Sequence, residues 1–326
     1  MSFPKLFADI GGTNARFALE IAPGELAAVQ VLPCAEYATL AAALQSYLSA
    51  AAVQAAGGAL VQQAGIAIAN PITGDHISMT NHHWSFSIEQ TRRLFGFEQL
   101  IVVNDFTALA MALPFLGQHQ LEQVGGAASV SGHAIGLLGA GTGLGVSGLV
   151  PSAEAWIPLH SEGGHTSFSP CNAREIAILE FAWREFSHVS SERLLSGPGL
   201  KLIYRALADY LRHPAQDLDA AAIVQRGLER SCPVCIDTLA SFCDMLGTMA
   251  GNLAVTLGAR GGIYIGGGIV PRLGSYLAES GFRRRFEQKG RFENYLSQIP
   301  IFVITEAYPA FIGLSALAGS RQQTAV

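Results

Sequence analysis

Three short segments combine glycines with polar residues directly after an apolar run: DIGGTN at 9–14, GAGTGLG at 139–145 and GGG at 266–268. Glycine lets the backbone approach a ligand closely and adopt dihedral angles that other residues avoid. Backbone N–H groups arranged in such turns bind anions, phosphate in particular. One turn of this kind is also compatible with an ordinary tight turn. Three of them, each at the end of a predicted strand, indicate a phosphate site, because ligands of open α/β sheets gather there.

The common nucleotide-binding signatures are missing from these turns. No Gly-Lys-Ser or Gly-Lys-Thr occurs, which excludes a Walker-type NTPase. GAGTGLG also departs from GxGxxG, because Leu144 occupies its sixth position. The lysines are only Lys5, Lys201 and Lys289, so backbone N–H groups, threonine hydroxyls and a metal ion would have to meet the charge of a polyphosphate.

Carboxylates and one histidine stand near these turns. Asp9 suits Mg²⁺, which prefers carboxylate oxygen and retained waters, but it could equally cap its own turn. Asn104 and Asp105 end a predicted strand, where an acid could serve as a general base or cap the next helix. Glu162 and His165 in HSEGGHTSFSP are compatible with metal ligation, with a clamp on sugar hydroxyls, or with a plain polar loop. No GxSxG or HExxH motif is present.

The elements that must position these residues alternate between strand and helix. Apolar strands are expected in AGIAIANPITG (64–74) and EQLIVVNDF (98–106), with helices over 39–53, 87–96 and 107–116. Unbroken apolar strands that alternate with helices predict a parallel sheet covered by helices.

The second half of the chain repeats this design. Residues 133–150 again give a strand, a glycine turn with a threonine, and a strand, an internal echo at the scale of a domain. Residues 172–258 are predicted to be mostly helical, and a late strand near 301–309 precedes a final helix. The apolar stretch 239–258 is as long as a membrane span, but it contains charged and amide side chains. We therefore expect a buried helix whose small residues let a neighbour approach closely.

Composition narrows the class of protein. The chain has 326 residues, 50% of them hydrophobic and 14% charged, with a net charge of −5, which indicates a globular protein without nucleic acid or anionic membrane as partner. MSFPKLFADIGG reaches a charged turn too early for a secretory signal. Five irregularly spaced cysteines favour a reducing cytoplasm over a disulfide framework. The lone CPVC at 232–235 is predicted to hold structural thiols, in preference to zinc or redox chemistry.

Long motifs then carry a family resemblance. DIGGTNAR, NPITGD, MTNHHWSFS, VVNDFTALAMALP, GAGTGLGV, EGGHTSFSP, HVSSERLLSGPG, GGIYIGGGIVPR and GFRRRFEQKGRF resemble the bacterial-type ATP-dependent glucokinases, in the order and at the spacing of that family, over about residues 6–318. The resemblance implies the two-domain, actin-like ATPase (ribonuclease H-like) α/β fold of sugar kinases, with a cleft between the domains. It implies a small domain over 1–115 plus 306–326, a large domain with helical insertions over 116–305, and a homodimer.

The same resemblance assigns roles to individual positions. Contacts with ATP phosphates and adenosine are expected at three segments: Ala8, Asp9, Ile10, Gly11, Gly12 and Thr13; Gly141, Thr142 and Gly143; Gly266, Gly267 and Gly268. Asp9 would help to position Mg²⁺ through a water-mediated contact. Asn104 and Asp105 would hold the 3-, 4- and 6-hydroxyls of the sugar, with Asp105 as the catalytic base. Contacts around the 1- and 2-positions would come from Glu162, His165 and Glu192.

The implied reaction is transfer of the γ-phosphoryl group of ATP to the 6-hydroxyl of glucose, for which Asp105 needs no raised pKa. A kinase for mannose, fructose or N-acetylglucosamine is the alternative, because the sequence does not show hydroxyl stereochemistry. A sugar-responsive repressor on this fold is not expected, since the phosphate motif begins at Asp9 and leaves no room for a helix-turn-helix. Structural zinc is not expected either, because only Cys171 follows His165 in its loop.

Overall fold

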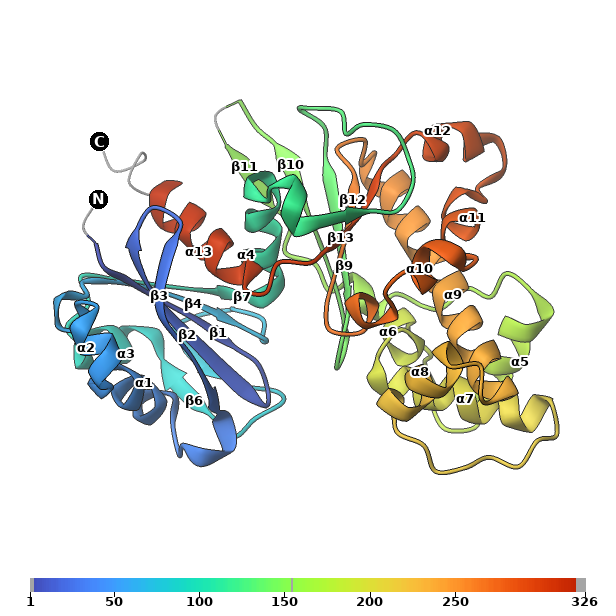
Figure 1. Ribbon diagram of the computed structural model, residues 1–326, viewed down its shortest axis with the longest axis horizontal. Coiled ribbons are helices and arrows are strands. Elements are labelled where there is room, and N and C mark those ends of the chain that lie inside the picture. Colours follow the sequence, from blue (N-terminus) through green and yellow to red (C-terminus); the bar gives the residue numbers. More distant parts are fainter. Residues whose placement is uncertain (1–2, 154, 321–326) are drawn as a thin grey trace. The chain divides into compact units, whose positions relative to one another are not determined.

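The computed structural model describes residues 3–153 and 155–320. The chain divides into two compact units, which are described separately (Figure 1). Unit 1 comprises Met1–Leu116 with Glu306–Val326, and unit 2 comprises Gly117–Thr305. We propose that these units are the two domains expected at 1–115 with 306–326 and at 116–305. The outermost residues of unit 1, 1–2 and 321–326, lie outside the described residues.

Unit 1 is built on a sheet that has five strands in the described residues, in the order β3-β2-β1-β4-β7. The strands are β1 Lys5–Ile10, β2 Asn14–Ala22, β3 Glu25–Pro33, β4 Gln63–Ile68 and β7 Gln99–Asn104. The predicted parallel arrangement holds for β1, β4 and β7, whereas β2 and β3 run antiparallel. The short DIGGTN turn explains this difference, because a tight turn joins antiparallel strands and a parallel pair needs a long crossover.

Helices and short segments complete unit 1: η1 Cys34–Glu36, α1 Leu40–Ser49, α2 Ala51–Ala55, η2 Gly58–Leu60, β5 His76–Ser78, β6 Ser85–Ser87, α3 Ile88–Leu94, α4 Asp105–Ala112, η3 Leu113–Phe115 and α13 Pro309–Ser320. The predicted single helix over 39–53 is wrong, because Ala50 is extended and separates α1 from α2. Ser87 caps α3, because its hydroxyl accepts the Gln90 N–H.

Helix α13 brings the end of the chain back to unit 1, beside α4 (Figure 1). The two helices approach at Gly313, where a Cβ would lie 1.8 Å from the Ala108 carbonyl oxygen. Phe311 and Leu314 of α13 are buried in a cluster with Phe7 of β1. Glu20 of β2 accepts a hydrogen bond from the Ser315 hydroxyl at 2.6 Å, so α13 is tied to the sheet by polar as well as apolar contacts.

Unit 2 contains a sheet with the order β11-β10-β9-β12-β13-β8, counted in residues 117–153 and 155–305. Its strands are β8 Leu121–Gln123, β9 Ile135–Ala140, β10 Leu144–Pro151, β11 Trp156–Pro158, β12 Ile263–Gly266 and β13 Ile301–Ile304. β9 pairs antiparallel with β10 across the GAGTG turn, as β1 pairs with β2 across DIGGT. β9, β12 and β13 run parallel. The repeat predicted from the sequence is therefore a repeat of strand topology: in each unit a glycine turn joins two antiparallel strands, and the first of them also has a parallel neighbour.

The helical part of unit 2 comprises η4 Gln118–Gln120, η5 Gly163–His165, α5 Ala173–Ala182, α6 Ser191–Leu194, α7 Gly197–Tyr210, α8 Ala220–Leu228, α9 Pro233–Leu257, η6 Val270–Leu273, α10 Tyr276–Glu279, α11 Phe282–Glu287, η7 Gly290–Phe292 and α12 Glu293–Ser297. The buried helix expected at 239–258 is part of α9, and its small residues admit α11: a Cβ at Gly247 would lie 2.2 Å from the Phe282 carbonyl oxygen. No helix in the described ranges combines the length and the apolar character that a membrane span needs.

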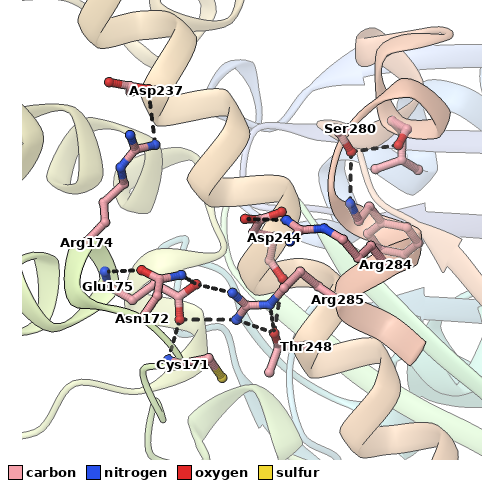
Figure 2. Close-up of polar contacts among 12 residues, drawn as sticks. Cys171, Asn172, Arg174, Glu175, Asp237, Asp244, Thr248, Ser280, Arg284 and Arg285 are labelled. Atoms are coloured by element: carbon pink, nitrogen blue, oxygen red, sulfur yellow. Dashed lines mark hydrogen bonds and ion pairs between the residues drawn. The ribbon is translucent and has the colours of Figure 1, made fainter. Parts of the chain in front are cut away.

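A buried ion pair joins three of these helices (Figure 2). Glu175 of α5 and Arg285 of α11 are 1% and 5% exposed, and their side chains meet at two atom pairs, 3.0 and 3.2 Å apart. Arg285 also donates from Nε to the Thr248 hydroxyl of α9 at 3.1 Å. The Glu175 carboxylate accepts further hydrogen bonds from the Cys171 N–H and the Asn172 side-chain amide. The pair is thus fully hydrogen-bonded, which a buried pair of charges requires.

Candidate functional site

The first glycine turn leaves β1 just after Asp9. Gly11 donates its N–H to the Asn14 carbonyl oxygen at 3.0 Å, which closes the turn between β1 and β2. Asp9 lies opposite Arg16 in the β1–β2 register, and Arg16 Nη1 donates to Asp9 Oδ2 at 3.1 Å. Burial raises the pKa of the Asp9 carboxyl, and the charge and hydrogen bond of Arg16 oppose that rise. Asp9 therefore forms an ion pair and does not cap its own turn through any hydrogen bond found in the described residues.

Asn104 and Asp105 stand where β7 passes into α4. Asn104 is the N-cap: its Oδ1 accepts the Phe106 N–H at 2.9 Å and the Thr107 N–H at 3.3 Å. Its Nδ2 donates to the Asn70 carbonyl oxygen at 3.4 Å. These contacts occupy the oxygen of the amide, and its N–H groups serve the Asn70 carbonyl oxygen and the Asp105 carboxyl. Of Asn104 and Asp105, either of which could have capped the helix, Asn104 is the residue that does so.

Asp105 is the first residue of α4, and its environment favours the protonated form. Burial raises the pKa of its carboxyl to about 6, and the nearby negative charge of Asp9 adds to the rise. Hydrogen bonds from the Phe106 N–H and the Asn104 side chain oppose it. The register places the ends of β1, β4 and β7 side by side, with Ile10 opposite Ile68 and Ile68 opposite Asn104. Asp9 in β1 and Asp105 at the start of α4 thus lie close enough for their charges to interact. The strand pattern alone did not predict this interaction.

A loop after β5 supports both features and was missed by the sequence analysis. The Asn70 side chain accepts the Thr80 N–H at 3.0 Å, while its backbone carbonyl accepts from Asn104. Next to Thr80, Asn81 packs on the glycine turn: a Cβ at Gly12 would lie 3.2 Å from Asn81. Asn70 is 8% exposed. A buried asparagine at the end of β4 was the available signal, because a buried amide normally has hydrogen-bonding partners.

The second and third glycine segments lie side by side in unit 2. β9 and β12 are parallel neighbours with Gly139 opposite Gly266. The Gly141 N–H donates to the Gly143 carbonyl oxygen at 2.8 Å and closes the GAGTG turn. Gly267 has φ +83, and a Cβ there would lie 2.4 Å from the Ala140 carbonyl oxygen, so only glycine fits. The backbone of both turns is therefore held together at the carboxyl ends of two parallel strands.

A cavity of about 270 Å³ opens directly after the triple glycine. It lies among α7, α8 and η6, and its walls are mainly apolar. The lining residues are Leu200, Ala220, Ala221, Val224, Gln225, Leu228, Ile269 and Arg272. No sequence motif reveals this cavity, because its walls come from three separate segments of the chain.

Glu162, His165 and Glu192 come together in unit 2 as one polar cluster. His165 Nε2 lies 4.0 Å from Glu162 Oε2, and His165 Nδ1 lies 3.8 Å from Glu192 Oε1. The other oxygen of Glu192 accepts the Leu144 N–H at 2.9 Å, at the edge of the GAGTG turn. A Cβ at Gly143 would lie 2.5 Å from that oxygen, which explains a glycine there. The carboxylates of the cluster are partly or largely exposed and free to accept hydrogen bonds from a ligand.

Metal ligation by side chains alone has little support in the described ranges, which hold no cluster of three or more His, Cys, Asp or Glu residues suited to a metal ion. The Glu162–His165 cluster contains two carboxylates and one imidazole, and each imidazole nitrogen lies within 4.0 Å of one carboxylate. Its chemistry suits hydroxyl groups, because carboxylates accept and an imidazole N–H donates.

Comparison with known proteins adds independent evidence. A sequence model of the family described as Glucokinase matches residues 6–321. A protein of Paraburkholderia xenovorans (strain LB400) named Bifunctional protein glk is 56% identical over 319 residues, which are 98% of this chain and 49% of that protein. The glucokinase of Chromobacterium violaceum is 52% identical over 315 residues, 97% of this chain and 89% of that protein. The chain therefore spans about half the length of its bifunctional relatives.

The fold agrees with these sequence matches. The crystal structure of glucokinase from an Antarctic psychrotroph superposes with a TM-score of 0.87 at 38% identity, and the match covers 98% of this chain and 100% of that one. It extends over both units and confirms the expected two-domain actin-like ATPase fold. The chain belongs to the glucokinase family.

Proposed function

We propose that this chain is an ATP-dependent glucokinase, which transfers the γ-phosphoryl group of ATP to the 6-hydroxyl of glucose and yields glucose 6-phosphate and ADP. Family membership supports the reaction class. The structural observation that carries the proposal is Asp105: a carboxyl group with a pKa near 6, at the end of a parallel strand and close to the glycine turn that follows Asp9.

Asp105 acts as the general base in this proposal. A base works best when its pKa lies near the working pH, because it is then largely deprotonated and still accepts a proton readily. At neutral pH most Asp105 carboxyls with a pKa near 6 are ionised. The carboxylate accepts the proton of the sugar 6-hydroxyl as its oxygen bonds to phosphorus. Positioning and charge stabilisation supply most of the remaining catalysis in phosphoryl transfer.

Other sugar contacts follow from the hydrogen bonds that the protein leaves open. In unit 1, Asn104 is proposed to contact a sugar hydroxyl, and its place beside Asp105 at the start of α4 supports this. In unit 2, Glu162, His165 and Glu192 are proposed to contact the hydroxyls around the 1- and 2-positions. Support comes from their grouping, because His165 lies within 4.0 Å of each of the two carboxylates.

ATP contacts are proposed for the glycine turns of each unit. In unit 1, the segment from Ala8 to Thr13 offers backbone N–H groups to phosphate oxygens. In unit 2, Gly141 to Gly143 do the same, and Gly266 to Gly268 lie at the adenosine side. The cavity next to the triple glycine is mainly apolar and has a few polar groups, which suits a nucleotide base.

Mg²⁺ fits the residues at the end of β1. Two acids with raised pKa values, Asp9 and Asp105, produce a local excess of negative charge that a cation would relieve. One Asp9 oxygen is paired with Arg16, which leaves the other for a bound water of the ion. When bound with ATP, Mg²⁺ supplies neutralisation of the phosphate charge. Asp9 would thus hold the ion through water.

A panel of hexoses tests the proposal. ATP-dependent phosphorylation of glucose, mannose, fructose and N-acetylglucosamine is measured in a coupled assay, with and without Mg²⁺. We expect the highest kcat/KM for glucose and no turnover without the metal. Equal or higher kcat/KM for another hexose would favour the alternative kinase, and no turnover with any sugar would refute the proposed reaction.

The pH dependence of kcat/KM follows from Asp105. Because only the carboxylate can accept a proton, kcat/KM should be constant above about pH 7 and fall below about pH 6, by about tenfold per pH unit once the acid is mostly protonated. The measurement is initial rate at low glucose from pH 5 to pH 8. Activity that stays level down to pH 5 would contradict the assignment of Asp105 as the base.

Filling the cavity tests its proposed role in binding the base. Ala221 is exposed at the cavity wall, so Ala221→Phe adds a ring without disturbing the core. We expect KM for ATP to rise about tenfold, because crowding of the bound base by the ring would cost about 1–3 kcal/mol. KM for glucose should change little. Ala52→Phe, at an exposed helical position in unit 1, is the matched control. Equal effects of the two variants on KM for ATP would exclude the cavity as the base site.

The oligomeric state and compartment are also proposals. The family resemblance supports a homodimer, and sedimentation equilibrium measures its mass directly. The free thiols of all five cysteines fit a reducing compartment such as the cytoplasm.

A further inference from the structure

The CPVC segment forms the start of α9 and brings two thiols into contact. Cys232 is the N-cap of the helix, Pro233 is its first residue, and Cys235 lies in the first turn. Residues three apart on a helix are neighbours, within the Cα separations that a disulfide tolerates. The Cys232 and Cys235 thiols are hydrogen-bonded to each other. This segment has no part in the proposed reaction.

The two thiols differ in the way that a redox pair requires. Cys232 is partly exposed, whereas Cys235 is completely buried. Burial raises the pKa of the Cys235 thiol to about 12, and its hydrogen bond with Cys232 acts in the same direction. Cys235 therefore keeps its proton at neutral pH. Cys232 is the accessible thiol and stands at the N-terminus of α9.

We propose that Cys232 and Cys235 are a reversible dithiol–disulfide pair that reacts with small-molecule disulfides such as oxidised glutathione. The Cys232 thiolate attacks one sulfur of the glutathione disulfide, forms a mixed disulfide and releases one glutathione thiolate. Cys235 then loses its proton to solvent, attacks Cys232 Sγ and expels the second glutathione thiolate. In total, two protein thiols are oxidised to one disulfide, and one glutathione disulfide is reduced to two thiols.

The position of the pair couples it to the cavity. Helix α8, which lines the cavity, ends four residues before Cys232. The connection is tightly bonded: the Ser231 N–H donates to the Arg226 carbonyl oxygen at 3.0 Å, and Arg230 has φ +56. A Cβ at Gly227 would lie 2.9 Å from the Cys235 carbonyl oxygen, so α8 packs closely against the first turn of α9. Bond formation draws Cys232 toward Cys235, and this pull is transmitted to α8.

The full chain is incubated with oxidised glutathione and mapped by mass spectrometry after alkylation of the remaining thiols. We expect the peptide containing both cysteines to lose the mass of two hydrogen atoms, and dithiothreitol to reverse the change. Cys232→Ser, at a partly exposed position, should abolish it. Cys171→Ser, at the exposed cysteine elsewhere in unit 2, should not. A stable glutathione adduct on Cys232, or no reaction there, would overturn the dithiol pair.

The coupling to α8 rests on the proposed function and has its own measurement. KM for ATP is compared between oxidised and reduced enzyme, and we expect a several-fold increase on oxidation in the wild type and none in Cys232→Ser. An unchanged KM in an enzyme whose disulfide is shown by mass would refute the coupling. Absence of glucose phosphorylation by the reduced enzyme would instead refute the proposed function, because the mass readout does not depend on activity.

Discussion

Asp105→Asn is expected to lower kcat for glucose phosphorylation by about 10²- to 10⁴-fold at pH 7, the usual contribution of a general base. The asparagine amide has nearly the same shape as the carboxyl group but cannot accept the proton of the 6-hydroxyl. Because the amide still hydrogen-bonds sugar hydroxyls, glucose should bind with an affinity within about an order of magnitude of the wild type. Stopped assays measure kcat, and isothermal titration calorimetry measures the glucose Kd. A near-normal kcat would remove Asp105 from the role of base.

Stability provides the control for this variant. A rise in the pKa of Asp105 from 3.8 to about 6 means that the folded state holds the proton more tightly than the unfolded chain does. The stability associated with that proton is present below about pH 4 and is lost as the pH rises through about 6. At pH 7 the ionised group therefore costs about 3 kcal/mol, an order-of-magnitude value, which Asn does not incur. Denaturant unfolding should show Asp105→Asn to be at least as stable as the wild type at pH 7, so lost turnover would not reflect unfolding.

The largest effect on stability is expected from Arg285→Met. Removal of the guanidinium group leaves the Glu175 carboxylate buried without its counter-charge, which typically costs about 3–5 kcal/mol. Because domains have unfolding free energies of about 5–15 kcal/mol, this loss is a large fraction of the total. Denaturant unfolding monitored by circular dichroism measures the change in midpoint.

Two further variants show whether burial of the ion pair causes the loss of stability in Arg285→Met. Arg184→Met breaks an exposed ion pair with Asp209 and should change the unfolding free energy by less than about 1 kcal/mol. The double variant Glu175→Leu/Arg285→Met removes both buried charges and should recover part of the stability lost in Arg285→Met. Equal losses for Arg285→Met and Arg184→Met would show that Glu175 finds another partner or is solvated in the folded protein.

Local sequence patterns predicted the parts of the fold that depend on short-range physics. Strands β4 and β7 were expected because their apolar runs end in polar residues. The echo between the DIGGT and GAGTG turns emerged because each turn joins two apolar strands. Assignments to ATP or to a hexose came from the family resemblance, since glycine turns alone do not distinguish among phosphorylated ligands.

Features that depend on packing between distant segments were not predictable in this way. The raised pKa of Asp105 arises from burial and from Asp9 on a separate strand. Lys5 is 2% exposed, with its Nζ 3.7 Å from Glu20 Oε2, although a lysine in a strand pattern usually indicates a solvent-facing position. The break at Ala50 is equally hidden, since alanine is the best helix former and tertiary structure overrides its propensity.

The return of α13 to unit 1 has a consequence for biosynthesis. During synthesis the segment 3–116 leaves the ribosome first, but the helix that packs beside Phe7, Ala108 and Gly65 follows only after all of unit 2. Unit 2 is continuous in sequence, so it can complete its core while unit 1 still presents an uncovered apolar face. Domains generally fold as units in the order in which they emerge. Here unit 2 can complete its fold before unit 1, because unit 1 still lacks α13. The nascent chain thus carries an exposed apolar surface on unit 1 until α13 emerges.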